Sequence, residues 1–211
     1  MGSHVWMAVT DFGDSALLFP CALLVAVWLF ASLRGMRVAV VWLGYCGLAV
    51  AIIALTKLAY MGWHIGIRGV DFTGLSGHTT LSFLIWPVLL FLMVGRSRLS
   101  RVLALIGGTA LASLIAVSRI AVHAHSPSEV VAGAVVGLSL STIFLRAHRR
   151  LFPLPLPRSR FLVTIMVPLL LGYGRIMPSE HMLEGVSAAL TGHGWVYTRH
   201  DARDLSHPSL R

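Results

Sequence analysis

The stretch SRIAVHAHSPSE, residues 118–129, places an arginine, two histidines and a glutamate between two long apolar runs. A second polar stretch upstream, Ser76-Gly77-His78, also lies at the edge of an apolar run. Ionisable side chains are costly to place at a membrane boundary, so they mark candidate functional sites. The two stretches therefore predict one functional site, and the rest of the chain has the pattern of a scaffold that brings them together.

Composition places the chain in the membrane class. Of its 211 residues, 56% are hydrophobic and only 12% are charged, with a mean hydropathy of +0.80. Soluble domains carry roughly 25% charged residues. The chain is therefore predicted to be an all-α polytopic membrane protein, a single helix bundle with no room for a second large domain. Cys21 and Cys46 lie inside apolar runs and indicate neither a disulfide framework nor a cysteine-based metal site.

The apolar runs predict about six transmembrane helices, at residues 15–33, 38–56, 78–94, 102–117, 130–145 and 161–173. Most are close to the ~20 residues that cross the hydrocarbon core, whereas the sixth is short for a full crossing. Ser118 and Arg119 are expected in a loop, and a short interfacial helix is expected near residues 61–67. Residues 1–14 are interpreted as a tag remnant and external N-terminus, residues 15–174 as the membrane-embedded bundle, and residues 175–211 as an interfacial or loosely ordered tail.

The charge distribution predicts the orientation of the bundle. Lys and Arg number 17 against 8 Asp and Glu, for a net charge of +9, and the arginines cluster after the first, third and fifth runs. Basic connections face the cytoplasm. Both polar stretches then face the periplasm or exterior of a bacterial inner membrane. Arginines beside apolar runs contact lipid headgroups, so the bilayer is the expected partner and nucleic acid is not. The oligomeric state stays open.

The residue types at the outer loops suit an anion. Lys57 and Arg119 supply positive charge, while Ser76 and Gly77 stand at a helix start, where unpaired amides point outward. A glycine there lets an oxyanion approach the backbone closely.

Two histidines in such a site fit a nucleophile and a proton donor. Glu129 follows His125 by four residues and is placed to accept its ring N–H, which sets the tautomer. These residues together predict phosphoryl transfer without a metal or other cofactor. A zinc site built from His78, His123, His125 and Glu129 is the rival interpretation, and the neighbouring cations, which would repel zinc, disfavour it.

The spacing resembles that of the type 2 phosphatidic acid phosphatases, which share their site with vanadium haloperoxidases. Their third motif is Ser-Arg, five residues, His, three residues and Asp; Ser118-Arg119, His125 and Glu129 match it with Glu in place of Asp. Their second motif is Ser-Gly-His, often preceded by Pro, and residues 76–78 match it with Leu in the Pro position.

The first motif of that family, Lys, six residues and Arg-Pro, is matched only in part. Lys57 stands at its start, but His64-Ile65 occupy the Arg-Pro positions. One phosphate ligand of the family is therefore unassigned here. Either His64 or Arg68 replaces it, and Arg68 is preferred because a guanidinium stays charged and grips phosphate with two nitrogens.

The resemblance implies a role for each matching residue. His125 would attack phosphorus and form a phosphohistidine, with Glu129 orienting the ring. His78 would protonate the leaving group. The phosphoryl oxygens would be held by the remaining residues, namely Lys57, Ser76, the Gly77 amide, Arg119, and Arg68 or His64.

The implied activity is hydrolysis of a phosphomonoester or diphosphate on a lipid. Candidate substrates are undecaprenyl diphosphate, phosphatidylglycerol phosphate, phosphatidate, a sphingolipid phosphate and a lipid A phosphate. Two alternatives use the same residues: a lipid phosphotransferase, and a non-catalytic lipid-phosphate binder or carrier.

Overall fold

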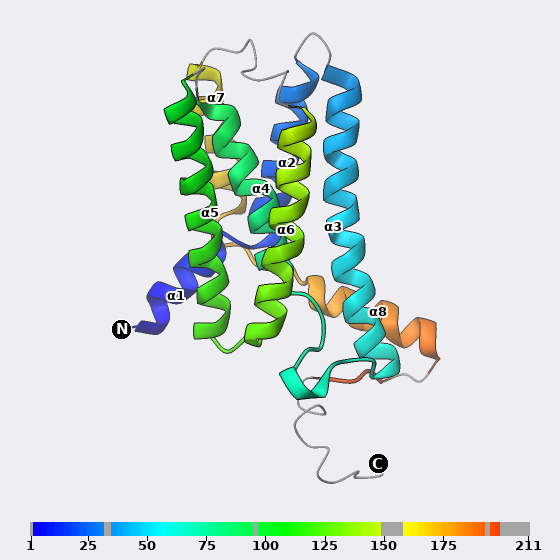
Figure 1. Ribbon diagram of the computed structural model, residues 1–211. Helices are drawn as coiled ribbons and strands as arrows, with labels where there is room; N and C mark the ends of the chain where they lie inside the picture. Colours follow the sequence, from blue (N-terminus) through cyan, green and yellow to red (C-terminus); the bar gives the residue numbers. More distant parts are fainter. Residues whose placement is uncertain (1, 32–34, 95–96, 149–157, 193–194, 199–211) are drawn as a thin grey trace.

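A computed structural model describes residues 2–31, 35–94, 97–148, 158–192 and 195–198. Within these ranges the chain is helical apart from loops, one short 3-10 turn and an isolated β-bridge between Ile67 and Phe72 (Figure 1). The elements are α1 (Gly2–Asp11), α2 (Ser15–Phe30), α3 (Gly35–Trp63), η1 (Arg68–Val70), α4 (Gly77–Met93), α5 (Arg98–Ala121), α6 (Pro127–Ala147), α7 (Arg158–Gly172) and α8 (Ser179–Thr191).

Four stretches of the described chain are long and apolar enough to cross a membrane. They are His4–Phe30, Gly35–Trp63, Arg98–Ala121 and Pro127–Ala147, and two shorter apolar helices, Gly77–Met93 and Leu162–Gly172, accompany them. The first stretch contains α2 and most of α1, which meet at a turn around residues 12–14. The prediction of an all-α membrane helix bundle is confirmed.

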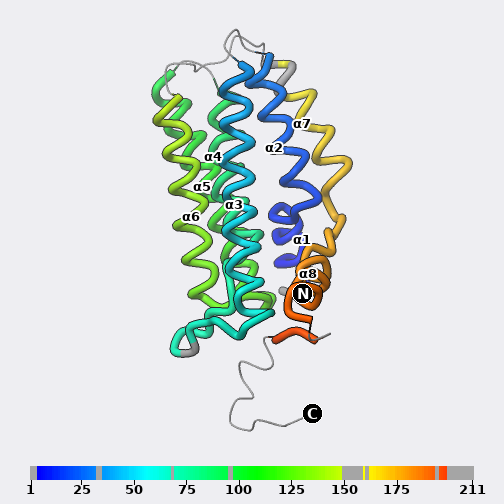
Figure 2. The backbone as a smooth tube through the Cα atoms, turned by 90° about the vertical axis from the view of Figure 1, so that its right-hand side faces the viewer, coloured from blue at the N-terminus to red at the C-terminus, as the bar shows by residue number. Residues whose placement is uncertain are grey.

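Helix α4 occupies the centre of the bundle. Every residue from Thr79 to Leu89 is buried, which is the pattern of a helix surrounded on all sides. It packs against α2, α3, α5 and α6. Figure 2 shows the helices of the bundle running side by side. The central position of α4 means that its first turn, which carries His78, lies among the other helices.

Glycines bring α5 and α6 close to α4. A Cβ atom at Gly133 would lie 2.8 Å from Thr80 Oγ1, and one at Gly137 would collide with the Thr80 carbonyl oxygen. On α5, a Cβ at Gly108 would lie 2.6 Å from Pro87 Cα. Small residues allow helix backbones in membranes to approach closely. The loop between α5 and α6 is thereby held beside the first turn of α4.

Two boundaries differ from those expected from hydropathy. Helix α3 continues to Trp63, so Lys57 lies inside the helix, and the interfacial helix expected near residues 61–67 is wrong, since residues 64–67 are not helical. Helix α5 continues to Ala121, so Ser118 and Arg119 lie in its last turn and not in a loop. A helix end predicted from hydropathy falls at the first charged residue. The helix itself continues past that residue when the charged side chain is accommodated inside the protein.

The two ends of the bundle differ in character. Helices α3 and α5 begin, and α6 ends, at the upper end in Figure 1, whereas the α5–α6 loop, the end of α3 and helix α8 lie at the lower end. Helix α1 packs on α5 and α8 packs on α3. Arg37, Arg98, Arg101 and Arg146 therefore lie near helix ends opposite the end that carries the α5–α6 loop, whereas Arg119 lies beside that loop.

Candidate active site

His125 and Glu129 form a tight pair at the start of α6. His125 Nδ1 lies 2.7 Å from Glu129 Oε2, and the Glu129 side chain is fully buried. Ser126 is the N-cap of α6 and forms a capping box with Glu129: the Ser126 amide donates to Oε2 at 3.2 Å, and the Glu129 amide donates to Ser126 Oγ at 3.4 Å. Helix-start chemistry therefore fixes the carboxylate that the histidine contacts.

Thr73 holds the other oxygen of the same carboxylate. Its amide donates to Glu129 Oε1 at 2.9 Å, and its hydroxyl donates at 2.5 Å. Sequence reasoning missed Thr73, because nothing in the local pattern pairs a loop threonine with a residue on α6. With Glu129 acting as an acceptor at both oxygens, His125 Nδ1–H donates a hydrogen bond to it, and Nε2 is the ring nitrogen that keeps a free lone pair.

The surroundings of His125 favour the neutral imidazole. Burial lowers the pKa of His125 below its ordinary value of 6.5, Lys57 and Arg119 add to this, and the hydrogen bond to Glu129 opposes it. A neutral ring is the form that has a lone pair to offer.

Arg119 is joined to His125 through the backbone. The Arg119 carbonyl accepts from the amides of Ala124 at 3.0 Å and His125 at 3.2 Å, and the chain reverses through His123, whose φ is 57°. Arg119 Nε is buried and has no hydrogen-bond partner among the described residues. An unpaired buried donor is costly, and this nitrogen lacks the partner that such a group normally has. Arg119 itself does not line the cavity that contains His125.

A cavity of about 150 Å³ connects His125 with Lys57. Its walls come from α3, the loop before α4, the α5–α6 loop and the C-terminal segment: Lys57, Tyr60, Met61, Thr73, Gly74, Ala124, His125, Glu180 and Tyr197. The Lys57 side chain is 13% exposed, and its Nζ donates to Glu180 Oε1 at 2.6 Å. Lys57 lowers the pKa of Glu180. A carboxylate from α8 thus neutralises the lysine that faces the cavity, a partner that the sequence does not reveal.

The loop before α4 is pressed against α3. Gly74 has φ of 144°, and a Cβ there would lie 2.9 Å from Lys57 Cγ. The Leu75 amide donates to Thr56 Oγ1 at 3.1 Å. This contact fixes the approach of the chain to Ser76 and Gly77.

Ser76 and Gly77 form the N-terminus of α4. The Ser76 side chain is fully buried and serves as the helix cap, accepting from Thr79 Oγ1 at 3.0 Å and from the Thr79 amide at 3.5 Å. The space beside Gly77 is open, since a Cβ there would meet only Ile53 Cγ2, at 3.7 Å. The hydroxyl is thus engaged in capping, while the glycine leaves room for an oxyanion.

His78 has a partner from another part of the bundle. Its Nε2 lies 3.6 Å from Asp14 Oδ2, and the Asp14 side chain is only 7% exposed. Asp14 is the N-cap of α2, a role that its position before Ser15 and an apolar run is typical of. Nothing in the sequence around Asp14 indicates that it contacts His78. Sequence reasoning therefore missed Asp14 as a site residue.

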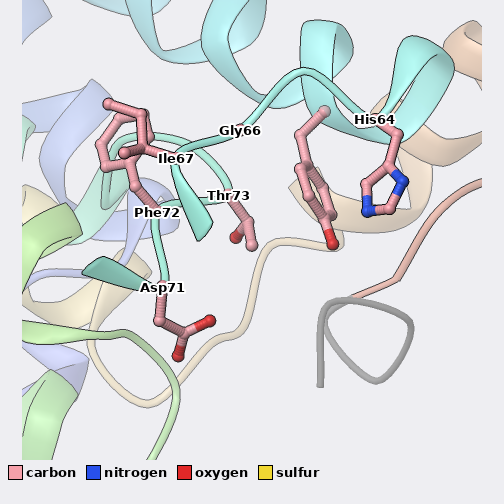
Figure 3. Close-up of a pocket in the computed structure, with 7 residues that line it drawn as sticks. His64, Gly66, Ile67, Asp71, Phe72 and Thr73 are labelled. Atoms are coloured by element: carbon pink, nitrogen blue, oxygen red, sulfur yellow. The ribbon is translucent and has the colours of Figure 1, made fainter. Parts of the chain in front are cut away.

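His64 lies in a separate, smaller pocket of about 30 Å³ lined by the hairpin that follows α3 (Figure 3). Its ring stacks on Tyr197, with centroids 4.5 Å apart, and its φ is 55°. His64 does not line the cavity of His125. The backbone of Arg68 lies in η1, and its side chain falls outside the described part of the structure.

The candidate zinc ligands do not come together. In the described part of the chain, no group of three or more His, Cys, Asp or Glu side chains has the arrangement to hold a metal ion. His78 and His125 instead each face a carboxylate of their own.

Comparison with known proteins supports the family suggested by the motifs. A family model described as the PAP2 superfamily matches residues 69–153, a range that includes His78, Arg119, His125 and Glu129 but not Lys57. The chain is 36% identical over 204 residues to an uncharacterized 22.5 kDa protein in the cps region of Klebsiella pneumoniae, covering 93% of this chain and 96% of that protein. No solved structure matches. The chain belongs to the PAP2 superfamily, whose members are generally phosphatases.

Proposed function

We propose that this protein is an integral membrane phosphatase that hydrolyses a phosphomonoester or diphosphate of a lipid through a phosphohistidine, without a metal. The observation that carries the proposal is the buried His125–Glu129 pair, 2.7 Å apart, at the edge of a cavity that also contains Lys57. A neutral histidine with an oriented ring and a nearby ammonium group has what is needed to attack phosphorus and to hold the charge that develops.

The first step makes the phosphoenzyme. His125 Nε2 attacks phosphorus, and a nitrogen–phosphorus bond forms as the bond to the leaving oxygen breaks. Glu129 holds the Nδ1 proton and stabilises the positive ring. His78 transfers its proton to the leaving oxygen. Lys57 and the unpaired Nε of Arg119 bind the phosphoryl oxygens.

The second step releases phosphate. His78, now neutral, takes a proton from water as the water oxygen attacks phosphorus. The nitrogen–phosphorus bond breaks, inorganic phosphate leaves and His125 returns to its starting form. The open space beside Gly77 accommodates a phosphoryl oxygen against the first amides of α4.

The placement of these side chains supports a lipid as the substrate. Lys57, Arg119 and Glu129 all belong to helices that are long and apolar enough to span a membrane. A lipid can therefore keep its tail in the bilayer while its phosphate enters between the helices. The helix ends that carry Arg37, Arg98, Arg101 and Arg146 lie at the opposite end of the bundle (Figure 1). By the positive-inside rule this cluster of arginines favours a site at the periplasmic face of a bacterial inner membrane.

The test is phosphate release from a panel of lipid phosphates and diphosphates in detergent with EDTA. Wild type should release phosphate, and His125→Ala should not. His123→Asn is the matched control, because it removes the other histidine of the same loop with a residue that tolerates the φ of 57°. An alkaline quench with labelled substrate should retain label on wild type, because phosphohistidine survives alkali and not acid.

Other outcomes separate the alternatives. Activity lost in EDTA and restored by zinc would revive the metal site. Phosphate passed to a lipid alcohol in preference to water would identify a phosphotransferase. Binding of a lipid phosphate without release or transfer would identify a carrier.

A further inference from the structure

The carboxylate of Asp14 is aimed at His78 by contacts that leave it little freedom. Asp14 Oδ1 accepts from the Ala16 amide at 2.8 Å, which caps α2, and from the Met177 amide at 3.2 Å. Its other oxygen, Oδ2, lies 3.6 Å from His78 Nε2. Because Oδ1 is held from two directions, the orientation of Oδ2 is determined as well.

The turn that carries Asp14 is locked between α4 and α5. The Phe12 carbonyl accepts from Trp86 Nε1 at 3.2 Å, and Thr10 Oγ1 and Ser118 Oγ are 2.7 Å apart. A Cβ at Gly13 would lie 2.5 Å from Ile115 Cγ2 and 3.3 Å from His78 Cδ2. The turn thus touches the helix of His78 on one side and the residue before Arg119 on the other.

We propose that Asp14 is the positioning residue of the proton donor: it accepts the Nε2 proton of His78 and so directs Nδ1 at the leaving oxygen. This inference rests on the proposed function. The distance of 3.6 Å is slightly longer than a hydrogen bond, as contacts of catalytic groups often are before substrate binds. Asp14 keeps its negative charge throughout, while the Nδ1 proton of His78 leaves in the first step and is regained from water in the second.

Two substitutions separate this role from helix capping. Asp14→Asn and Asp14→Ser both retain a good N-cap for α2. Asparagine presents either an amide donor or a neutral oxygen to His78 in place of the charge, and serine presents nothing that reaches it. Asp11→Asn is the control for charge alone, since the Asp11 carboxylate, one turn earlier on the same segment, acts on His78 through its charge, whereas the ion-pair contact with His78 belongs to Asp14.

The activity readout compares leaving groups. A lipid alcohol needs a proton as it departs, whereas p-nitrophenolate does not. Both Asp14 variants should lower kcat on the lipid phosphate by roughly 10²-fold, the scale of general acid catalysis, with a much smaller effect on p-nitrophenyl phosphate. Equal losses on both substrates, or no loss on either, would overturn the proposal.

A second readout does not depend on turnover. Nitrogen-15 NMR of histidine-labelled protein, with His78 assigned from the spectrum of His78→Gln, reports which ring nitrogen carries the proton. Wild type should show Nε2 of His78 protonated in both the charged and the neutral form of the ring, and Asp14→Asn should alter the Nε2 signal more than Asp11→Asn does. An unchanged His78 signal in Asp14→Asn would reject the positioning role. A wild type inactive on every substrate would defeat the proposed function instead, and the NMR result would still decide the Asp14–His78 contact.

Discussion

Two carboxylate–histidine pairs in this molecule are built in different ways. His125 and Glu129 stand four residues apart, contact each other at 2.7 Å and belong to one capped helix start. His78 and Asp14 come from the first turn of α4 and from the α1–α2 turn, and their nearest atoms are 3.6 Å apart. One pair is a product of local helix geometry, and the other exists only because three helices pack together.

The two carboxylates also differ in how many hydrogen bonds hold them in place. Glu129 is fully buried and accepts hydrogen bonds at both oxygens, from His125, Ser126 and Thr73. Asp14 has one oxygen occupied by backbone amides and the other directed only at His78 among the described contacts. The group that is proposed to bond to phosphorus is held more firmly than the group that is proposed to move a proton.

The largest effect should come from breaking the tighter pair. Glu129→Gln replaces the carboxylate with a neutral amide that cannot stabilise a positive His125 ring. We expect kcat to fall on the order of 10²–10⁴-fold, by analogy with other orienting carboxylates. Because both leaving groups require the nucleophile, the loss should be similar on a lipid phosphate and on p-nitrophenyl phosphate, in contrast with the Asp14 variants.

Glu184→Gln on α8 is the control for this change, since it removes a glutamate that contacts His181 at the surface. A Glu129→Gln protein that keeps full kcat, with its fold intact by size-exclusion chromatography, would show that the pair is structural.

The acidic limb of the pH profile should sharpen the comparison. The nucleophile is the neutral form of His125, which predominates above its pKa, and burial lowers that pKa below 6.5. As pH falls, kcat/KM should therefore stay constant until a pH below 6.5, where His125 becomes protonated. Below that point it should decrease about tenfold per pH unit. In Glu129→Gln the residual activity should decrease only at still lower pH, because the hydrogen bond to Glu129 that raises the pKa of His125 is lost. A limb at the same pH in both proteins would assign it to another group, such as the substrate phosphate.

The smallest effect concerns a third carboxylate, Glu180, which contrasts with both pairs because its side chain is 63% exposed. It neutralises Lys57 at the cavity, so an incoming phosphate has to displace it. Glu180→Gln should lower KM by about two- to fivefold with little change in kcat, the range of a surface ion pair. Glu184→Gln again serves as the control on the same helix. A raised KM would indicate instead that Glu180 helps to place Lys57.

Much of the fold was accessible to sequence reasoning. Apolar runs located the membrane helices. The pairing of His125 with Glu129 followed from a spacing of four residues, because side chains so spaced meet at a helix start. The ends of α3 and α5 were placed too early, because hydropathy cannot show that Lys57 and Arg119 turn inward.

The sequence by itself determined what is local: the apolar helices and the pairing of His125 with Glu129. Tertiary structure alone decided that Asp14 faces His78, that Thr73 braces Glu129, that Glu180 reaches Lys57 and that His64 stacks on Tyr197 away from the cavity. The physical reason is that these membrane helices are apolar on every side, so the order of their residues does not show which faces meet. Their small residues and polar loops select the partners only when the bundle is packed.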